Sequence, residues 1–356
     1  MARPATQQVD EATVAGLATL AGDFMTRRTS ALVWGPGAAR GDEPLANNVA
    51  HESAAVLAAE RAALAELVER RDALSDWGER YTDSSSVVTV QRVTTQGNTV
   101  TLDVEELSRL SYAKISGHEP EYTAFAADRR FVFNRYGPTW RLDSAELLGN
   151  GAPPVNEPTG AGREEMRTAL QRSGQAMTAK PAQVTRTDVG PQGEPITVSY
   201  NYSAMAAYAE RYWRYYNTSY RNFNNSGNQG GDCTNFVSQI MRAGGWTDDT
   251  GWYRDPWNWW YNSLNQTWSW INVGYWFQFA AQYSRRTYIL SNVWYMGLAD
   301  VLQADFSSDG VKDHSMTVSY IGDQPYLTYH TNDTYRRSLS SILATSPTGT
   351  WWAHRT

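Results

Sequence analysis

The sequence feature that most constrains the fold is a stretch rich in proline, glycine, threonine and glutamine over residues 149–196. Within it, only residues 163–172 show the apolar spacing of a helix. Such a composition is typical of a linker or of a connection draped over a surface. At 356 residues, the chain is also too long for one ordinary domain. We therefore predict an accessory domain over residues 1–148, a linker over 149–196 and a second domain over 197–356.

The accessory domain changes from a helical period to a strand period. Apolar residues recur at helical spacing over about 8–28, and residues 47–77 are rich in the strong helix formers Ala, Leu, Glu and Arg. Alternating valines on both sides of Gly97-Asn98 then predict a β-hairpin. Two apolar runs, 122–125 and 130–133, predict a second pair of strands.

This order of elements, helices first and a curled antiparallel sheet afterwards, resembles the nuclear-transport-factor-like cone, a fold that often serves as an accessory domain. The resemblance covers residues 8–148 and rests on the element order and a closing strand at Trp140-Arg141-Leu142. It implies a smaller α+β cone-like domain. His51 and His118 lie in this region without candidate ligands at metal spacing, so we interpret both as structural or surface residues.

The second domain contains the only cysteine of the chain, Cys233. It follows Gly230-Gly231, which would let a substrate backbone approach the thiol, and it opens a run with helical spacing that ends at Gly244-Gly245. A thiol in the first turn of a helix lies at the positive end of the helix dipole, which favours the nucleophilic thiolate. A lone cysteine can equally be a small buried hydrophobic residue, so its neighbours have to decide.

Two downstream histidines are candidates for the base that a thiolate nucleophile needs. Residues 315–331 alternate polar and apolar on both sides of Gly322-Asp323, which predicts a hairpin with a two-residue turn. This register makes His314 and His330 diagonal neighbours at one end of the hairpin, and we expect them to lie within side-chain reach. The sequence thus offers Cys233 a base and an orienting partner.

Residues 228–239, Asn-Gln-Gly-Gly-Asp-Cys-Thr-Asn-Phe-Val-Ser-Gln, closely resemble the putative amidase domain family of papain-like, NlpC-type hydrolases. The other matching segments follow in order: 208–217 for the opening helix, 299–303 for the strand before the histidine, then 309–314 and 326–331. The resemblance spans about 198–352 and departs at Ala299, where glycine is commoner. It implies an α+β papain-like cysteine hydrolase domain, in which an N-terminal nucleophile helix packs on an antiparallel sheet.

The resemblance also implies the roles of the catalytic residues. By it, Cys233 is the nucleophile and His314 is the general base and acid. The third position of papain-like enzymes falls 16 residues after that histidine, on His330. Asn332 and Asp333 stand close behind and are the fallback for this third position.

The residues just before the cysteine are candidates for oxyanion stabilisation and substrate binding. The backbone N–H of Cys233 would be one oxyanion donor, and the side chains of Asn228 and Gln229 are placed to supply a second. Asp232 has two interpretations: an N-cap of the nucleophile helix, which we favour, or an anchor for a substrate amine.

The sequence therefore predicts a cysteine-dependent hydrolase that cleaves an amide C–N bond through a thioester on Cys233. The substrate would be a peptide, a protein or a peptidoglycan stem peptide. Two alternatives stay open: a transglutaminase-like amine acyltransferase, and a Trp-rich module that binds glycan or peptide, because 12 of the 15 tryptophans lie from Trp213 onward. We expect no cofactor and no metal, since one cysteine and scattered histidines offer no ligand spacing.

Charge argues against nucleic acid as a partner, and hydropathy argues against a membrane span. The net charge is −6, and residues 201–356 contain equal numbers of acidic and basic residues, which argues against nucleic acid. No apolar run approaches the roughly 18 residues of a membrane span. Abundant Trp, Tyr and Asn beside a single thiol favour a secreted or extracytoplasmic protein whose signal peptide has been removed, with a cytoplasmic protein as the alternative. The oligomeric state is left open.

Overall fold

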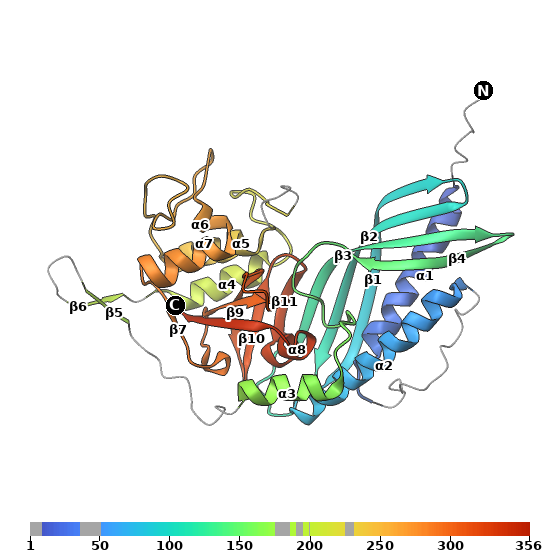
Figure 1. The fold of residues 1–356 in the computed structure, drawn as a ribbon, viewed down its shortest axis with the longest axis horizontal. Helices are drawn as coiled ribbons and strands as arrows, with labels where there is room; N and C mark the ends of the chain where they lie inside the picture. The colour runs from blue at the N-terminus through green and yellow to red at the C-terminus, as the bar shows by residue number, and fades with distance from the viewer. Residues whose placement is uncertain (1–8, 36–50, 175–185, 190–194, 199, 225–230) are drawn as a thin grey trace. The chain divides into compact units, whose positions relative to one another are not determined.

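The fold is known from a computed structural model that describes residues 9–35, 51–174, 186–189, 195–198, 200–224 and 231–356. The chain divides into two compact units. The first unit comprises Met1–Thr168 and Ser340–Pro347, and the second comprises Ala169–Leu339 and Thr348–Thr356. Each contains helices and an antiparallel sheet (Figure 1). The chain is therefore α+β, as predicted, while the domain boundaries at 148 and 196 stay predictions.

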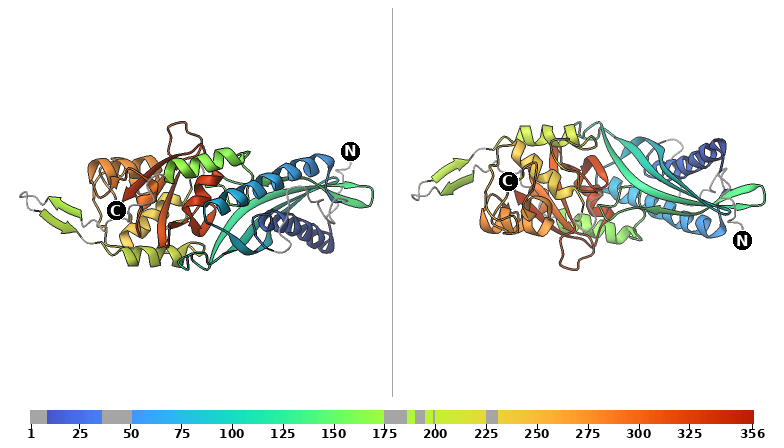
Figure 2. Two further views of the ribbon diagram at one scale, coloured as in Figure 1. Left: turned by 90° about the horizontal axis from the view of Figure 1, so that it is seen from below. Right: turned by 90° about the horizontal axis from the view of Figure 1, so that it is seen from above.

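The first unit begins with two long helices, α1 (Glu11–Ser30) and α2 (Ala54–Asp76). Four antiparallel strands follow in sequence order: β1 (Tyr81–Gln96), β2 (Thr99–Tyr112), β3 (Tyr122–Tyr136) and β4 (Thr139–Leu147). Helix α1 lies along this sheet (Figure 2), where Phe24 packs edge-on against Phe131 with ring centroids 5.9 Å apart. Gln96 pairs with Thr99, so the predicted hairpin turn at Gly97-Asn98 is confirmed.

The predicted pair of strands at 122–125 and 130–133 is wrong, because both runs belong to the single strand β3. The four residues between them, 126–129, contain no glycine, proline or asparagine that would favour a turn. They continue the ladder with β2 instead, where Ala126 pairs with Leu107 and Arg129 with Val104.

In its described residues, the second unit contributes six strands to the large antiparallel sheet and packs helices against them. Its helices are α4 (Tyr202–Tyr212), α5 (Cys233–Ala243), α6 (Trp268–Ile271) and α7 (Val273–Phe277), the last continued by a π-helical turn at Gln278–Tyr283. In spatial order its strands are β11 (Asp333–Ser338), β10 (Pro325–Tyr329), β9 (His314–Ile321), β8 (Val301–Asp305), β12 (Thr350–Arg355) and β7 (Tyr288–Ile289). Neighbouring strands run antiparallel.

The remaining elements are α3 (Arg163–Gly174), the paired strands β5 (Arg186–Val189) and β6 (Pro195–Val198), a short 3-10 helix (Val293–Tyr295) and α8 (Leu339–Thr345). Most of α8 belongs to the first unit, although it follows β11 in the chain. There the hydroxyl of Ser340 donates to the carboxylate of Glu79, which also accepts a hydrogen bond from Tyr81 at 2.6 Å. The first unit is thus built from two separate parts of the sequence.

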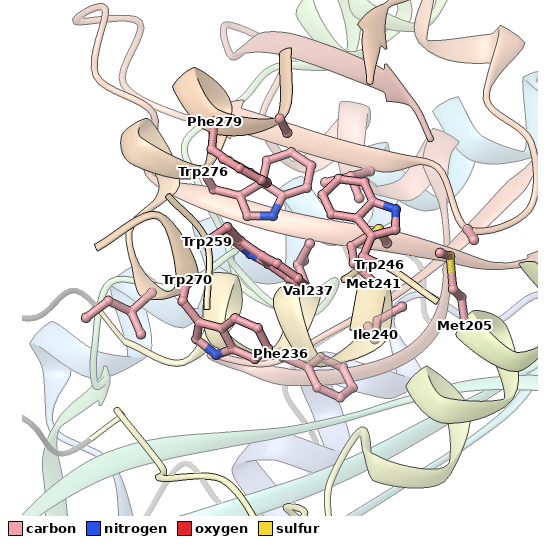
Figure 3. Packing of buried hydrophobic residues seen from close by; sticks show 14 of the residues in the cluster. Met205, Phe236, Val237, Ile240, Met241, Trp246, Trp259, Trp270, Trp276 and Phe279 are labelled. Carbon is pink, nitrogen blue, oxygen red and sulfur yellow. The ribbon is translucent and has the colours of Figure 1, made fainter. Parts of the chain in front are cut away.

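Helix α5 carries the apolar core of the second unit. Its buried face packs with a group of tryptophans (Figure 3): Phe236, Val237, Ile240 and Met241 against Trp246, Trp259, Trp270 and Trp276. The indole N–H groups of Trp259 and Trp270 are satisfied inside this core, by Ser238 at 3.0 Å and by Asn235 at 2.8 Å. The predicted end at Gly244 is confirmed, and a Cβ there would lie 2.2 Å from the side chain of Met205. The sequence that forms α5 therefore fixes where its first residue, Cys233, lies.

The hairpin of β9 and β10 has a longer turn than predicted. Residues 322–324 form it, with Gly322 N–H donating to the Gln324 carbonyl at 3.2 Å. A register shift after the Tyr326–Tyr320 pair then absorbs the extra residue. Beyond this bulge Leu327 pairs with Val318, which is the register that a two-residue turn predicted.

Candidate active site

The thiol of Cys233 lies at the first position of α5 and is almost fully buried, with 1% of the residue exposed. Its Sγ lies 3.8 Å from the Thr234 hydroxyl. Burial raises the pKa of the thiol, while a backbone hydrogen bond from Ser315 and the Thr234 hydroxyl act in the opposite direction. The expected preference for thiolate is therefore wrong for this closed state, because desolvation outweighs the donors at the helix start.

Buried polar side chains connected by hydrogen bonds extend from Thr234, beside the thiol, to His354. Thr234 Oγ1 lies 3.1 Å from Ser315 Oγ, Gln303 Nε2 donates to Ser315 Oγ at 3.3 Å, and Gln303 Oε1 lies 3.2 Å from His354 Nε2. The sequence analysis missed these residues. A signal existed for three of them, since Thr234 and Ser315 directly follow Cys233 and His314 and Gln303 ends the strand expected before the histidine, but nothing in the sequence pointed to His354.

His314 is the first residue of β9 and is also 1% exposed. Its ring packs edge-on against Tyr329, with centroids 5.3 Å apart, and at a tilt against Phe306, with centroids 6.0 Å apart. Burial, followed by the charge of His330, lowers the pKa of His314 to about 3, so the ring is neutral at pH 7. Within the described residues, its Nε2 atom has no hydrogen-bond partner. A buried polar atom without a partner is rare in folded proteins and points to a functional role.

Ser315, the residue after His314 on β9, lies between His314 and the thiol of Cys233. Successive side chains of a strand point to opposite faces, so His314 and Ser315 diverge. The Ser315 hydroxyl contacts Thr234 of α5, and the Ser315 backbone makes a hydrogen bond to the thiol. Among the described residues, no hydrogen bond joins Sγ to a histidine. The two candidates are therefore neighbours that are not yet paired, as is common for catalytic groups without substrate.

His330 keeps the predicted register, but its side chain pairs with groups other than His314. Extending the observed register puts His330 across from Ser315, and strand alternation then separates it from His314. Its Nδ1 lies 2.6 Å from Asp232 Oδ2, and its Nε2 lies 2.8 Å from the Tyr212 carbonyl oxygen. The predicted side-chain contact with His314 is therefore not formed, because a one-residue offset across a ladder reverses the face.

Asp232 occupies the N-cap position of α5, but its side chain makes no capping hydrogen bond. Its fully buried carboxylate accepts instead from Phe223 N–H at 2.9 Å and from Asn235 Nδ2 at 2.8 Å, in addition to His330. The predicted N-cap position is confirmed, but the capping hydrogen bond is not formed, because three other donors occupy the carboxylate. The substrate-anchor role of Asp232 stays a prediction.

Of the two fallback residues, Asn332 lies in the tight turn after β10 and Asp333 is the first residue of β11. Thr331 and Asn332 have φ values of 66° and 58°, in the left-handed region. The Asp333 carboxylate accepts hydrogen bonds from the Tyr216 hydroxyl at 2.7 Å and from Thr331 N–H at 3.2 Å. Burial raises the pKa of Asp333 to about 6.

The residues just before Asp232 are only partly described. Asn228, Gln229 and Gly230 lie outside the described residues, so the predicted oxyanion donors stay predictions. Gly231 has a φ of 89°, and a Cβ there would lie 3.0 Å from the Thr331 hydroxyl oxygen. The backbone conformation of Gly231 and its close approach to Thr331 both favour glycine here, while the predicted approach of a substrate backbone stays a prediction.

The tryptophans of the second unit are divided between its interior and its surface. Trp259, Trp270 and Trp276 are fully buried, whereas Trp252 and Trp257 are 60% and 53% exposed. In the described part of the chain, no group of three or more His, Cys, Asp and Glu side chains is arranged to hold a metal ion. Within the same residues, no helix combines the length and apolarity of a membrane span.

Comparison with known proteins locates a family domain in the second part of the chain. Residues 199–352 match a family model described as a putative amidase domain. The match supports an amidase-domain family for this region and, at this coarse level, a hydrolase that acts on C–N bonds.

Other comparisons add little. The crystal structure of the intermembrane space region of chloroplast protein ARC6 is 12% identical over 40% of this chain and 99% of that one. Its TM-score is 0.27, which is too low to support any statement about fold or function. No curated protein matches the chain.

Proposed function

We propose that the chain is a papain-like cysteine amidase that cleaves an amide bond in a peptide, with Cys233 as the nucleophile and His314 as the base. The coarse amidase assignment of residues 199–352 supports the reaction class. One observation carries the choice of residues: His314 Nε2 is a buried ring nitrogen without a partner among the described residues, next to the strand residue whose backbone bonds the thiol.

The choice between the two histidines follows from their free nitrogens. A general base must have a ring nitrogen available to accept a proton. Both nitrogens of His330 are occupied, by Asp232 and by the Tyr212 carbonyl oxygen. His314 is neutral at pH 7, because its pKa is lowered to about 3, and its Nε2 is unoccupied in the described structure. Only His314 is in the state that a base needs.

The reaction that we propose has two halves. The substrate carbonyl reaches Cys233 Sγ, and His314 takes the thiol proton as the C–S bond forms. The tetrahedral intermediate expels the amine, which leaves with the proton that His314 returns, and a thioester remains on Cys233. Water then attacks the thioester, again with His314 accepting and returning the proton. The backbone N–H of Cys233, at the start of α5, would stabilise both oxyanions.

The closed geometry adds one requirement to this scheme. Cys233 and His314 are both almost completely buried, and among the described residues no hydrogen bond joins them. Substrate binding therefore has to expose the thiol and turn the His314 ring toward it. Burial raises the pKa of Cys233, so the thiol stays protonated until His314 accepts its proton.

The test is to incubate the full chain with casein peptides and with a digest of bacterial cell wall. We expect release of primary amines and, by mass spectrometry, an acyl adduct on Cys233. In Cys233→Ala both signals should vanish, with a loss of turnover of about 10⁴-fold or more. Adding a primary amine separates hydrolysis from acyl transfer, because a transferase would yield the amine adduct of the acyl group.

A matched control is Asn201→Ala, which removes the cap of α4 and lowers stability without touching the site. We expect this variant to keep its activity, which would show that a loss in Cys233→Ala is chemical and not a consequence of lower stability. Full turnover in Cys233→Ala would rule out the proposed mechanism.

A further inference from the structure

The contacts of His330 suggest a role different from that of an orienting third residue. Its Nδ1 faces a carboxylate oxygen of Asp232 at 2.6 Å, and its Nε2 faces the Tyr212 carbonyl oxygen at 2.8 Å. A carbonyl and an ionised carboxylate only accept hydrogen bonds, so both ring nitrogens donate, which requires the protonated ring. We propose that His330 is a positively charged positioning residue that ties the start of the nucleophile helix to the end of β10.

The rings around His330 are arranged to hold a cation. Phe236 stacks on one side, with centroids 3.6 Å apart and planes 5° from parallel. Tyr216 also stacks on it, at 4.0 Å and 28°. The negative faces of aromatic rings attract a cation, and this attraction is strongest where water is excluded. His330 is buried, so the sandwich and the Asp232 carboxylate together replace the hydration of the charge.

Four titratable groups act on His330 or feel its charge: Asp232 before α5, Asp333 on β11, Tyr216 after α4 and His314 on β9. Burial lowers the pKa of His330, but the hydrogen bond to Asp232, the charges of Asp333 and Asp232 and the Tyr212 carbonyl together raise it above its ordinary value. The charge of His330 in turn adds to burial in lowering the pKa of His314.

His330 positions Cys233 through the carboxylate of Asp232. The same carboxylate accepts from Phe223 N–H and from Asn235 Nδ2, so the ion pair joins three segments around the first turn of α5. Since Cys233 follows Asp232 directly, the pair fixes the nucleophile from one side. The charge also acts on His314, where it adds to the larger effect of burial in lowering the pKa. The functional part of this inference rests on the proposed roles of Cys233 and His314, whereas the ion pair itself does not.

The charge can be measured without any substrate. We would record the imidazole ¹⁵N resonances of the full wild-type chain between pH 4 and 9, where only five histidines contribute. We expect both nitrogens of His330 to be protonated at pH 7, while His314 is neutral. A neutral His330 at pH 6 would overturn the proposal. This readout remains valid if Cys233→Ala turns out to be active, so failure of the ion pair and failure of the proposed function are distinguishable.

Variants then test the source of the charge and its effect. In Asp232→Asn we expect the pKa of His330 to fall by about 1 unit or more, and in Asp333→Asn by less, because Asp333 makes no hydrogen bond to His330. In His330→Gln the pKa of His314 should rise, on the order of 1 unit, and the acid limb of the amidase pH profile should move with it.

The sign of that last shift separates two roles. An orienting residue that stabilises protonated His314 raises its pKa, so losing such a residue would lower it; a charged His330 does the reverse. A fall or no change in the pKa of His314 in His330→Gln would therefore overturn the proposal. His354→Gln is the matched control, because it removes another buried histidine whose pKa is lowered to about 3, so no charge is lost. We expect it to leave the pKa of His314 unchanged.

Discussion

A buried arginine of the first unit and the two buried candidates of the second unit differ in the partners that they have. In the first unit, the buried Arg129 pairs with Glu106 and with Glu157, the latter at 2.6 Å; these carboxylates outweigh the effect of burial and raise the pKa of Arg129. In the second unit, Cys233 and His314 are buried without an ionic partner among the described residues. Paired charges indicate structure, whereas an unpaired buried nitrogen next to a thiol indicates chemistry.

The largest effect that tests this comparison is on activity. His314→Leu should lower turnover by about 10³-fold or more, because it removes the proposed base. The free energy of unfolding should change by less than about 1.5 kcal/mol, since the ring contacts aromatic neighbours and its Nε2 loses no partner. Amine release and urea unfolding measure the two quantities. A severe loss of stability with intact turnover would reverse the assignment.

The next effect is on stability in the first unit. Arg129→Leu leaves the carboxylates of Glu106 and Glu157 without their buried partner, and we expect it to cost about 3–5 kcal/mol in urea unfolding. The double variant Arg129→Leu, Glu106→Leu should recover part of this loss, because it also removes one unpaired charge. A single variant that unfolds like the wild type would mean that the pairing contributes little to this interior.

The pH dependence of stability should also differ between the histidines. The pKa of His314 is lowered from 6.5 to about 3, so the unfolded chain binds the proton first and stability falls as pH drops below 6.5. The slope from this group approaches about 1.4 kcal/mol per pH unit. Between pH 5 and 7, the free energy of unfolding should therefore depend less on pH in His314→Leu than in the wild type. An identical pH dependence in both proteins would contradict the buried neutral ring.

His330 contributes with the opposite sign. Its pKa is raised in the folded state, so its contribution to stability is complete below the unfolded value near 6.5. The contribution is lost as pH rises through the folded value. The wild type minus His330→Gln difference in unfolding free energy should thus shrink toward alkaline pH. A difference that grows with pH would be inconsistent with a protonated ring.

The smallest effect concerns ordinary helix capping in the second unit. Asn201 accepts a hydrogen bond from Ala204 N–H at 2.9 Å and caps α4, so Asn201→Ala should cost about 1 kcal/mol. Asp232 holds the equivalent position of α5 but bonds other groups. If the thermal unfolding of Asn201→Ala matches that of the wild type, the cap of α4 contributes little to stability.

The sequence was informative where local physics decides the structure. Helical spacing and glycine predicted α5 from Cys233 to its end, and Gly97-Asn98 predicted the β1–β2 turn. The continuity of β3 was harder to predict. Residues 126–129 contain no glycine, proline or asparagine to indicate a turn, and no β-branched or aromatic residue to indicate a strand. The amidase resemblance agrees with the family match over residues 199–352.

The candidate site was less predictable, because its contacts join residues far apart in the chain. The hairpin register was correct for Leu327 and Val318. Yet an offset of one residue across the ladder sent His314 and His330 to different surroundings. That Asp232 would meet a histidine 98 positions later, and not cap its own helix, depends on how α5 packs against the sheet. Local propensity contains no information on that packing.

The placement of α8 has a consequence for dissecting the protein. Residues Ser340–Pro347 count with the first unit, yet they are flanked on both sides by residues of the second. No single cut in the chain separates the two units. A fragment that ends at Thr168 would lack part of its own interior, and one that begins at residue 197 would carry a helix removed from its partner Glu79. Interrupted connectivity of this kind makes the folding of each unit dependent on the complete chain.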